Sequence, residues 1–338
     1  MESSYKENLY GIEKDNDILF LRNILLSNLF SLPYYMIKHR KAFSVFYVVS
    51  IYWYTVFPII ICFLLRKKIV IGVTLSMLDS PAVQPKEFVK GLYYKYKNFQ
   101  FKLANYIFVN STLLFNECKQ CGYDDRIVKL INNPVDTTVF HAVDIVKRND
   151  LRRSIGIDVN RFTILFIGSI NKRKGADLLP TLFRELHNRI PQGVNFIVCG
   201  QKGYPESQSI IDELSQIFQS SLGDFVIKEE VNDTSPFYQM ADLFLFPTTN
   251  EGMPNVILEA MASQCMIVCN TLAGITDQIL DEVFLVKENN ISDYIEKIEN
   301  YVSNPLKYEN MIIENRKKME KEFTAEIVDE KIINFLNK

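Results

Sequence analysis

The chain has 338 residues, 48% of them apolar and 12% aromatic, so it can bury large cores and is not a disordered polymer. Its 38 Lys and Arg nearly balance its 40 Asp and Glu, which argues against a protein that coats nucleic acid. The balance hides opposed halves, because residues 1–155 carry 21 Lys and Arg against 13 Asp and Glu, whereas residues 156–338 carry 17 against 27. The first half, with a net charge of +8, is expected to face an anionic partner such as a membrane surface, a substrate phosphate or a nucleic acid.

The cysteines and the N-terminus bear on the compartment. Six Cys are spread along the chain, several of them inside apolar runs, which is not the pattern of a disulfide framework. The first 17 residues have mixed charge and no hydrophobic region followed by a cleavage site, so they predict no secretory signal. We therefore expect an intracellular protein.

A long apolar run dominates the first third of the chain. Residues 42–65 are uncharged and are flanked by basic residues on both sides. The run is long enough to cross a bilayer as one helix. The run is also rich in β-branched and aromatic residues, contains Pro58, and is followed by a second apolar run at 68–74. A strand, a short helix and another strand would give the same hydropathy, and we favour that interpretation.

The rest of the first half predicts further strands and helices. Strands are expected within 104–111 and 125–134, and helices at 91–102 and 111–120. A charged stretch without a strong apolar period, residues 141–160, predicts a domain boundary.

The second half alternates between strand-like and helix-like periods, which predicts an α/β domain with a parallel sheet. The expected strands are residues 162–169, 194–200, 225–231, 241–247 and 266–270. The expected helices are residues 177–190, 209–221 and 254–263, with a terminal packing helix at 324–338.

Two segments of this half are candidates for chemistry, although the cations of the first, taken alone, are more typical of a solvated basic loop. In FIGSINKRKG (166–175) a strand ends in glycine and is followed by three cations and a helix start, where an anionic ligand can bind. In EGMPNVILEAMA (251–262) a proline opens a helix whose first amides are free for a phosphate, with one Glu before the helix and one inside it. Carboxylates eight residues apart at such a helix start can bind sugar hydroxyls around the phosphate.

Residues 162–280 resemble the donor-binding domain of the retaining glycosyltransferases of family 4, which have the two-domain GT-B fold. The landmarks follow the family order: FIGSINKRKG, FIVCGQKG, FVIKEEV, YQMADLFLFPTTNEGMPNVILEAMAS and AGITDQIL. Upstream, ANYIFVNS (104–111) and NPVDTTVF (133–140) resemble the end of the family's first domain and its linker. The resemblance covers about two thirds of the chain, and the Glu-x7-Glu element is its most specific part.

The resemblance implies roles for individual residues. Lys174 and Arg173 would neutralise the donor diphosphate and Glu251 would contact the donor sugar, which makes these three the predicted catalytic residues. Glu259 would hold the ribose, and the backbone around Val231 would meet the base. The full set of predicted donor-binding residues is Gly168, Ser169, Gly200, Val231, Gly252, Met253, Asn255, Val256 and Glu259. The family works without a bound metal, so no metal and no cofactor besides the nucleotide diphosphate sugar are expected.

The chain departs from the family pattern at two places. The family often has Arg where this chain has Ser169, and its first domain usually opens with a strand and a glycine-rich loop that are not visible here. The resemblance therefore implies an α/β GT-B fold, two Rossmann-like domains facing a cleft, with a shortened first domain. We predict an acceptor-side domain at 1–155, a donor-binding domain at 156–322, and a terminal helix at 323–338 that packs back on the first domain.

The resemblance implies a retaining glycosyltransferase, and we expect it to move a hexose or N-acetylhexosamine from a UDP- or GDP-linked sugar to a lipid-linked or saccharide acceptor. Its place would be the synthesis of a cell-surface polysaccharide such as capsule or O-antigen. The basic half would meet anionic lipid, so the enzyme is expected to be cytoplasmic and peripheral on the inner face of the cell membrane, with no nucleic-acid partner. Two alternatives stay open: a non-catalytic or truncated nucleotide-sugar-binding homologue, and an integral membrane protein that spans the bilayer at 42–65.

Overall fold

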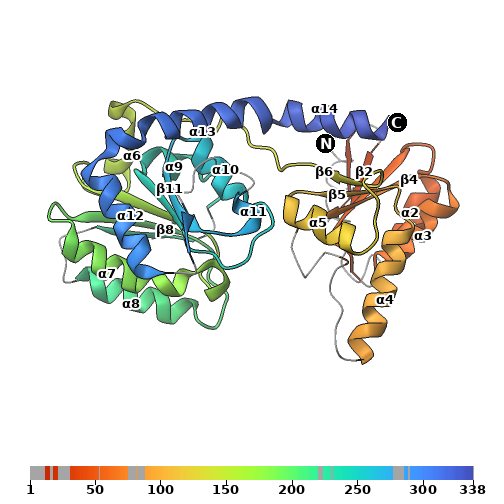
Figure 1. Cartoon of the computed structure of the whole chain (residues 1–338), viewed down its shortest axis with the longest axis horizontal. Coiled ribbons are helices and arrows are strands. Elements are labelled where there is room, and N and C mark those ends of the chain that lie inside the picture. The colour runs from red at the N-terminus through yellow and green to blue at the C-terminus, as the bar shows by residue number, and fades with distance from the viewer. Residues whose placement is uncertain are drawn as a thin grey trace. The chain divides into compact units, whose positions relative to one another are not determined.

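The structure is a computed structural model of the whole chain. It describes residues 12–15, 18–21, 31–52, 54–74, 81, 88–219, 224–229, 231–276, 285–287 and 290–337. The chain divides into two compact units, unit 1 at Met1–Asn132 and unit 2 at Asn133–Lys338. Each unit contains a six-stranded sheet (Figure 1).

The strands of unit 1 lie in the sheet in the order in which they occur along the chain. The first two strands pair antiparallel, and every later pair is parallel. The strands are β1 (Ile12–Asp15), β2 (Ile18–Leu21), β3 (Val45–Val49), β4 (Lys68–Val73), β5 (Tyr106–Val109) and β6 (Val128–Leu130). The helices described between them are α2 (Ser31–Lys38), α3 (Val56–Leu64), α4 (Phe88–Lys102) and α5 (Thr112–Gln120).

The largest buried cluster of unit 1 lies on one face of this sheet, and Val45, Val70 and Phe108 are buried on the other face. The strand residues of the cluster share a face because the register pairs Phe46 with Ile69 and Ile71 with Ile107. All four described helices contribute to the same buried cluster, through Met36, Ile59, Cys62, Phe101, Leu114 and Cys118. Right-handed crossovers that always advance in one direction place their helices on one face, which accounts for this packing.

The apolar run at 42–65 is divided among several elements. It contains β3 and α3, and the next apolar run forms β4, which pairs with β3 from Val45–Lys68 to Val49–Gly72. The prediction of a strand, a helix and a strand is confirmed. In the part of the chain that the structure describes, no helix has the length and the apolar character needed to cross a membrane.

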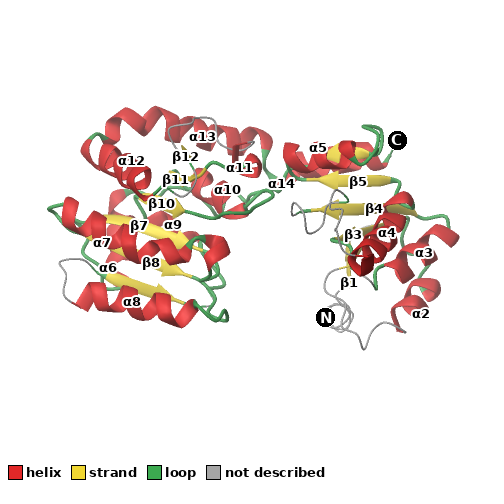
Figure 2. Cartoon of the chain, turned by 60° about the horizontal axis from the view of Figure 1, so that its bottom comes forward, coloured by secondary structure: helices red, strands yellow, loops and turns green. Residues whose placement is uncertain are grey.

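The sheet of unit 2 is parallel and its strand order reverses (Figure 2). The order is β12-β11-β10-β7-β8-β9, so the chain first builds outward from β7 in one direction and then returns to build in the other. The strands are β7 (Phe162–Ile167), β8 (Val194–Cys199), β9 (Phe225–Lys228), β10 (Leu243–Phe246), β11 (Met266–Asn270) and β12 (Leu285–Val286). In such sheets ligands bind at the carboxyl ends of the strands where the order reverses, here beside β7 and β10.

Helices cover both faces of this second sheet. Phe183 of α7 stacks on Phe196 of β8 with 3.6 Å between ring centroids, whereas Tyr238 of α9 packs on Phe244 of β10. The register places Phe196 and Phe244 on opposite faces. The helices and 3-10 turns of unit 2 are α6 (Ile145–Ser154), η2 (Lys172–Lys174), η3 (Ala176–Leu178), α7 (Leu179–Arg189), α8 (Ser207–Gln219), α9 (Ser235–Met240), α10 (Asn255–Ala262), α11 (Ala273–Thr276), α12 (Ile291–Ser303), η5 (Pro305–Tyr308), α13 (Glu309–Glu322) and α14 (Ala325–Leu336).

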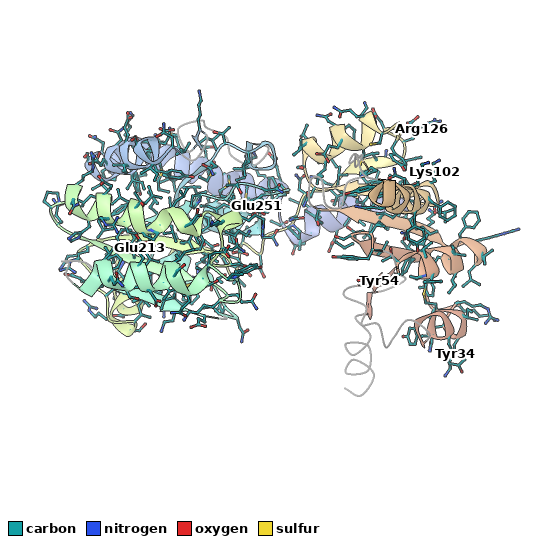
Figure 3. All side chains as sticks on the ribbon, turned by 90° about the horizontal axis from the view of Figure 1, so that it is seen from below. Tyr34, Tyr54, Lys102, Arg126, Glu213 and Glu251 are labelled. Atoms are coloured by element: carbon teal, nitrogen blue, oxygen red, sulfur yellow. The ribbon has the colours of Figure 1, made fainter. Side chains whose placement is uncertain are left out.

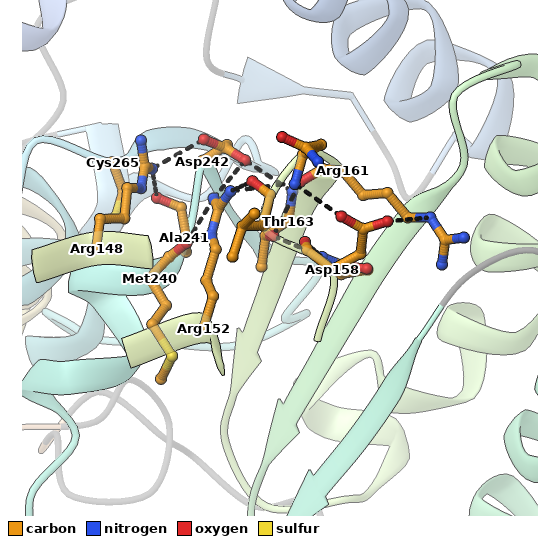
Figure 4. Close-up of polar contacts among 12 residues, drawn as sticks. Arg148, Arg152, Asp158, Arg161, Thr163, Met240, Ala241, Asp242 and Cys265 are labelled. Atoms are coloured by element: carbon orange, nitrogen blue, oxygen red, sulfur yellow. Dashed lines mark hydrogen bonds and ion pairs between the residues drawn. The ribbon is translucent and has the colours of Figure 1, made fainter. Parts of the chain in front are cut away.

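The division between the units lies earlier than the predicted boundary at 155/156. Buried Arg152 of α6 donates to the Met240 carbonyl at 2.7 and 2.9 Å and to Asp242 Oδ2 at 2.8 Å, and Arg148 also pairs with Asp242 (Figure 4). A buried guanidinium needs such partners, so α6 is fixed to unit 2. The charged stretch predicted as a boundary is therefore part of the second unit.

Contacts further upstream explain where the division does fall. Arg316 of α13 donates to the carbonyls of Phe140 and Thr137, and the Val135 amide donates to the Phe323 carbonyl at 2.8 Å. These bonds hold residues 133–140 on unit 2. The predicted terminal helix is observed as α14, and its packing on the first domain stays a prediction.

Candidate active site

One carboxylate oxygen collects three donors at the carboxyl end of the unit 2 sheet. Glu251 Oε1 accepts from Lys174 Nζ at 2.6 Å, from Arg173 at 3.0 Å and from the Thr248 hydroxyl at 3.0 Å. The Glu251 side chain is 8% exposed, and Figure 3 labels it. The structure thus brings together the three residues that the sequence predicts as catalytic, and it adds Thr248 to them.

The turn after β7 positions the two cations. Asn171 caps η2, because its side chain accepts from the Lys174 amide at 2.9 Å. Gly175 ends the turn with φ of 71°, a left-handed conformation that glycine adopts without strain. The Arg173 carbonyl accepts from the Thr249 amide at 2.9 Å, which ties the turn to the loop after β10. Both cations are therefore fixed by backbone contacts as well as by Glu251.

A hollow of about 320 Å³ lies at the ends of β7 and β8. Four predicted donor-binding residues line it, namely Gly168, Ser169, Gly200 and Val231. Its other lining residues are Ile167, Cys199, Gln201 and Thr234. The Lys174 side chain passes 3.6 Å from the position that a Cβ on Gly168 would take, so the hollow adjoins the cationic turn. The two groups of predicted residues therefore lie next to each other.

Gly200 has a structural reason to be glycine. A Cβ at this position would lie 1.9 Å from the Gly168 carbonyl oxygen, closer than any contact between real atoms allows. The packing of the chain therefore excludes a side chain at position 200, whether or not a ligand also needs the space.

Glu259, predicted to bind the ribose, has a buried partner within unit 2. Its Oε2 accepts from the Tyr238 hydroxyl at 2.9 Å, and the same hydroxyl lies 3.2 Å from the Val256 carbonyl oxygen. Burial raises the pKa of the Glu259 carboxyl, and the hydrogen bond from Tyr238 opposes that shift. Burial and the neighbouring Glu259 together raise the pKa of Tyr238 well above its usual value.

The start of α10 faces the same loop region. The helix begins after Pro254, and among the described residues no side chain caps it, so the first-turn amides, including those of Asn255 and Val256, are open to a ligand. The Asn133 side chain donates to the Met253 carbonyl at 2.9 Å and to Asn255 Oδ1 at 2.7 Å. These bonds fix the Gly252–Asn255 turn.

Several residues of the site were not predicted. They are Asn171, Gln201, Thr234, Tyr238 and Thr248. Asn171 lies four residues after the end of β7 and Thr248 two residues after the end of β10, so a search for polar residues in the loops after buried strands would have found them. The pairing of Tyr238 with Glu259 spans 21 residues and depends on tertiary packing.

Within the described ranges, no group of three or more His, Cys, Asp or Glu is placed to hold a metal ion. The expectation that the reaction needs no metal stays a prediction.

Known proteins resemble this chain in sequence and in fold. Capsular polysaccharide biosynthesis glycosyltransferase CapM of Staphylococcus aureus is 27% identical over 180 residues, which are 53% of this chain and 46% of CapM. Alpha-galactosylglucosyldiacylglycerol synthase of Streptococcus pneumoniae is 27% identical over 194 residues, 55% of this chain and 49% of that protein. The chain thus spans about half the length of these curated relatives.

A solved structure covers most of both units. The crystal structure of Anabaena Alr3699/HepE in complex with UDP and glucose matches with a TM-score of 0.74 at 17% identity, over 91% of this chain and 81% of that one. The fold, two α/β units with parallel sheets, is therefore that of the GT-B glycosyltransferases, as the sequence predicts. The family described as glycosyl transferases group 1 matches residues 147–319, just over half of the chain, and the chain belongs to that family.

Proposed function

We propose that the protein transfers a sugar from a nucleotide diphosphate sugar to an acceptor hydroxyl, with retention of configuration at the anomeric carbon. The observation that carries the proposal is the convergence of Lys174, Arg173 and Thr248 on Glu251 Oε1 beside the hollow at β7 and β8. Family membership adds support, and the Anabaena protein has UDP and glucose bound.

Each group of residues has a part in this proposal. The base and ribose would occupy the hollow near Val231 and reach toward Glu259, and the diphosphate would lie over Gly168 and Ser169. Amides at the start of α10, around Gly252, Met253, Asn255 and Val256, would bind the phosphate or the sugar hydroxyls. These placements follow the order of the residues around the carboxyl edge of the sheet.

Charge development explains why two cations stand beside one carboxylate. When the bond between the sugar carbon and the diphosphate oxygen breaks, the electron pair leaves with the diphosphate, and Lys174 and Arg173 stabilise the added negative charge. The acceptor oxygen would form the new bond on the face from which the diphosphate leaves, which retains the configuration, and its proton would pass to the departing diphosphate oxygen. Glu251 Oε2, the oxygen that does not take part in the three hydrogen bonds above, would accept from a hydroxyl of the donor sugar. No metal or further cofactor is included in this proposal.

The acceptor side is proposed from the relatives and from charge. One relative is named for capsular polysaccharide biosynthesis and another as a glycolipid synthase, which supports a hexose or N-acetylhexosamine donor and a lipid-linked or saccharide acceptor. The basic first half supports work at the inner face of the cell membrane, in capsule or O-antigen synthesis.

A panel of UDP- and GDP-sugars tests the proposal. One or more of them should raise the thermal unfolding temperature, and that donor should then be turned over with a lipid-linked acceptor. Stabilisation without turnover by any acceptor would favour a non-catalytic sugar-nucleotide-binding protein. If no member of the panel stabilises the protein, the proposed donor class is wrong.

A further inference from the structure

The α3 helix of unit 1 presents apolar side chains on its outer surface. Its nine residues, VFPIIICFL, include no charged or hydroxyl-bearing side chain. Val56, Pro58, Ile59 and Cys62 are buried, whereas Phe57 is 46%, Ile60 36%, Phe63 55% and Leu64 73% exposed. A helix on a protein surface ordinarily carries polar residues on its outer face, so this one departs from the pattern.

The neighbouring helix extends this surface. α2 packs beside α3 (Figures 1 and 2) and exposes Tyr34 and Ile37, and Tyr34 is labelled in Figure 3. We call the six exposed apolar residues the α2–α3 face: Tyr34, Ile37, Phe57, Ile60, Phe63 and Leu64. Large exposed apolar side chains on two helices that pack on each other are typical of an interaction surface.

The segment that contains the α2–α3 face carries positive charge only. Residues 31–74 contain six Lys and Arg and no Asp or Glu. Lys38 is the last residue of α2, and Arg40 and Lys41 come shortly after it. Arg66, Lys67 and Lys68 follow the C-cap residue of α3. A hollow of about 510 Å³ at the end of α3 is lined by Phe63 and Leu64 together with the same basic triplet. Apolar side chains and cations thus share one surface.

We propose that the α2–α3 face docks unit 1 on a membrane surface that contains anionic lipids. The exposed Phe, Ile and Leu side chains would enter the boundary between head groups and acyl chains, while the long basic side chains would keep their charges at the phosphates. Juxtaposed apolar and basic groups are what such an interface binds. A second copy of this chain fits the same surface poorly, because six positive charges would face six more.

Docking on a membrane deepens the proposed function, because it would bring the protein to a lipid-linked acceptor. The usefulness of docking rests on the proposed function, whereas the docking itself does not. Membrane docking needs neither donor nor turnover. The two can therefore fail separately.

Co-sedimentation with vesicles tests the docking surface. We expect the full chain to bind vesicles of phosphatidylcholine and phosphatidylglycerol at low salt, and to bind pure phosphatidylcholine vesicles at least tenfold more weakly. The double variant Phe63→Ser/Leu64→Ser should lose at least tenfold in partitioning to the anionic vesicles. Arg66→Gln should lose about fivefold, the fold-change expected for one cation near a charged membrane.

A matched control removes two exposed apolar residues from unit 2. Ile145→Ser/Val146→Ser changes adjacent exposed residues of α6 and should leave vesicle binding unchanged. All variants should keep the wild-type far-UV circular dichroism and the wild-type thermal shift with the donor nucleotide, which separates docking from folding and from donor binding.

The proposal is overturned if the wild type does not bind anionic vesicles at low salt, or if the Phe63→Ser/Leu64→Ser variant binds them as well as the wild type. It is also overturned if that variant instead abolishes self-association or binding to an acidic protein while vesicle binding persists. Loss of vesicle binding in this variant together with intact binding in the control supports it.

Discussion

The sheets of the two units, parallel throughout in unit 2 and parallel except for the first pair in unit 1, have different strand orders. In unit 2 the strand order reverses beside β7, and helices lie on both faces. In unit 1 the strands follow the order of the chain, and the four described helices pack on one face. A reversal is what opens a crevice at the carboxyl ends of a parallel sheet, so the winding explains why the candidate site forms in unit 2.

The charges of the two units show a second contrast. Unit 2 contains 21 Lys and Arg against 30 Asp and Glu, yet it gathers Arg173 and Lys174 at one turn, where an anionic donor would bind. Unit 1 contains 17 against 10, and the cations of residues 31–74 border exposed apolar side chains. The net charge of a unit therefore does not identify its ligand, whereas the placement of a few charges does.

The largest effect is expected where unit 2 buries a charge. Arg152→Ala should lower the free energy of unfolding by about 3–5 kcal/mol, because the buried Met240 carbonyl loses both of its Arg152 donors and Asp242 keeps only Arg148 as a cationic partner. Arg153→Ala, one residue further along α6 and exposed, should change it by less than about 0.5 kcal/mol. Urea unfolding followed by circular dichroism measures both. Equal free energies of unfolding for the two variants would contradict the assignment of α6 to unit 2.

The next effect concerns the reaction. Lys174→Ala and Glu251→Ala should each lower the rate of sugar transfer by about 10²–10³-fold, because charge stabilisation at the leaving group is lost or misplaced. Lys172→Ala removes an exposed cation of the same turn and should have little effect. The rates are measured with the donor identified by thermal shift, after circular dichroism shows that the variants fold. Wild-type rates in both variants would place the chemistry elsewhere.

A smaller effect is expected at the turn that carries the cations. Gly175→Ala forces a side chain into a left-handed conformation and within 2.0 Å of the Pro247 carbonyl oxygen, so it should cost about 2 kcal/mol or more. Gly156→Ala has the same kind of backbone conformation and open space, and should cost about 1 kcal/mol. Thermal unfolding of the two variants should differ, and a smaller loss in Gly175→Ala than in Gly156→Ala would contradict the packing described here.

The smallest effect is a dependence on pH. Burial raises the pKa of Glu259 in the folded protein, so the folded state holds the proton more tightly than the unfolded state does. The ionised carboxylate therefore costs stability above its unfolded pKa, and the cost grows until the pH passes the folded pKa. Glu259→Gln cannot ionise and can still accept from Tyr238, so its stability relative to wild type should rise from mildly acidic to neutral pH. Urea unfolding at several pH values measures this difference, and a constant difference would contradict the assignment.

The sequence predicts most of unit 2 because its signals are local. Strands such as Phe162–Ile167 and Val194–Cys199 are continuous apolar runs, as a sheet buried on both faces requires, and they are found where expected. The cationic turn and Glu251 are also found together, since both follow strands at the same edge. The resemblance to a known family supplied the roles proposed for them.

Other features depend on contacts between distant residues, and the sequence does not reveal them. The stretch 141–160 has the composition of a linker, yet Arg148 and Arg152 bond to residues about 90 positions away. In the sequence Tyr238 is indistinguishable from an ordinary core residue, and only the folded structure shows that its hydroxyl donates to Glu259. The sequence also does not predict the exposed apolar face of α3, because hydropathy does not say which residues of a short apolar helix are covered.

Calorimetric titration of UDP and GDP tests the central claim, that the turn after β7 and Glu251 form the donor site of unit 2. We predict that one of the two nucleotides binds the wild type, that Lys174→Ala weakens this binding at least tenfold, and that Lys172→Ala leaves it unchanged. Equal binding by wild type and Lys174→Ala, or no binding by the wild type, would contradict the account.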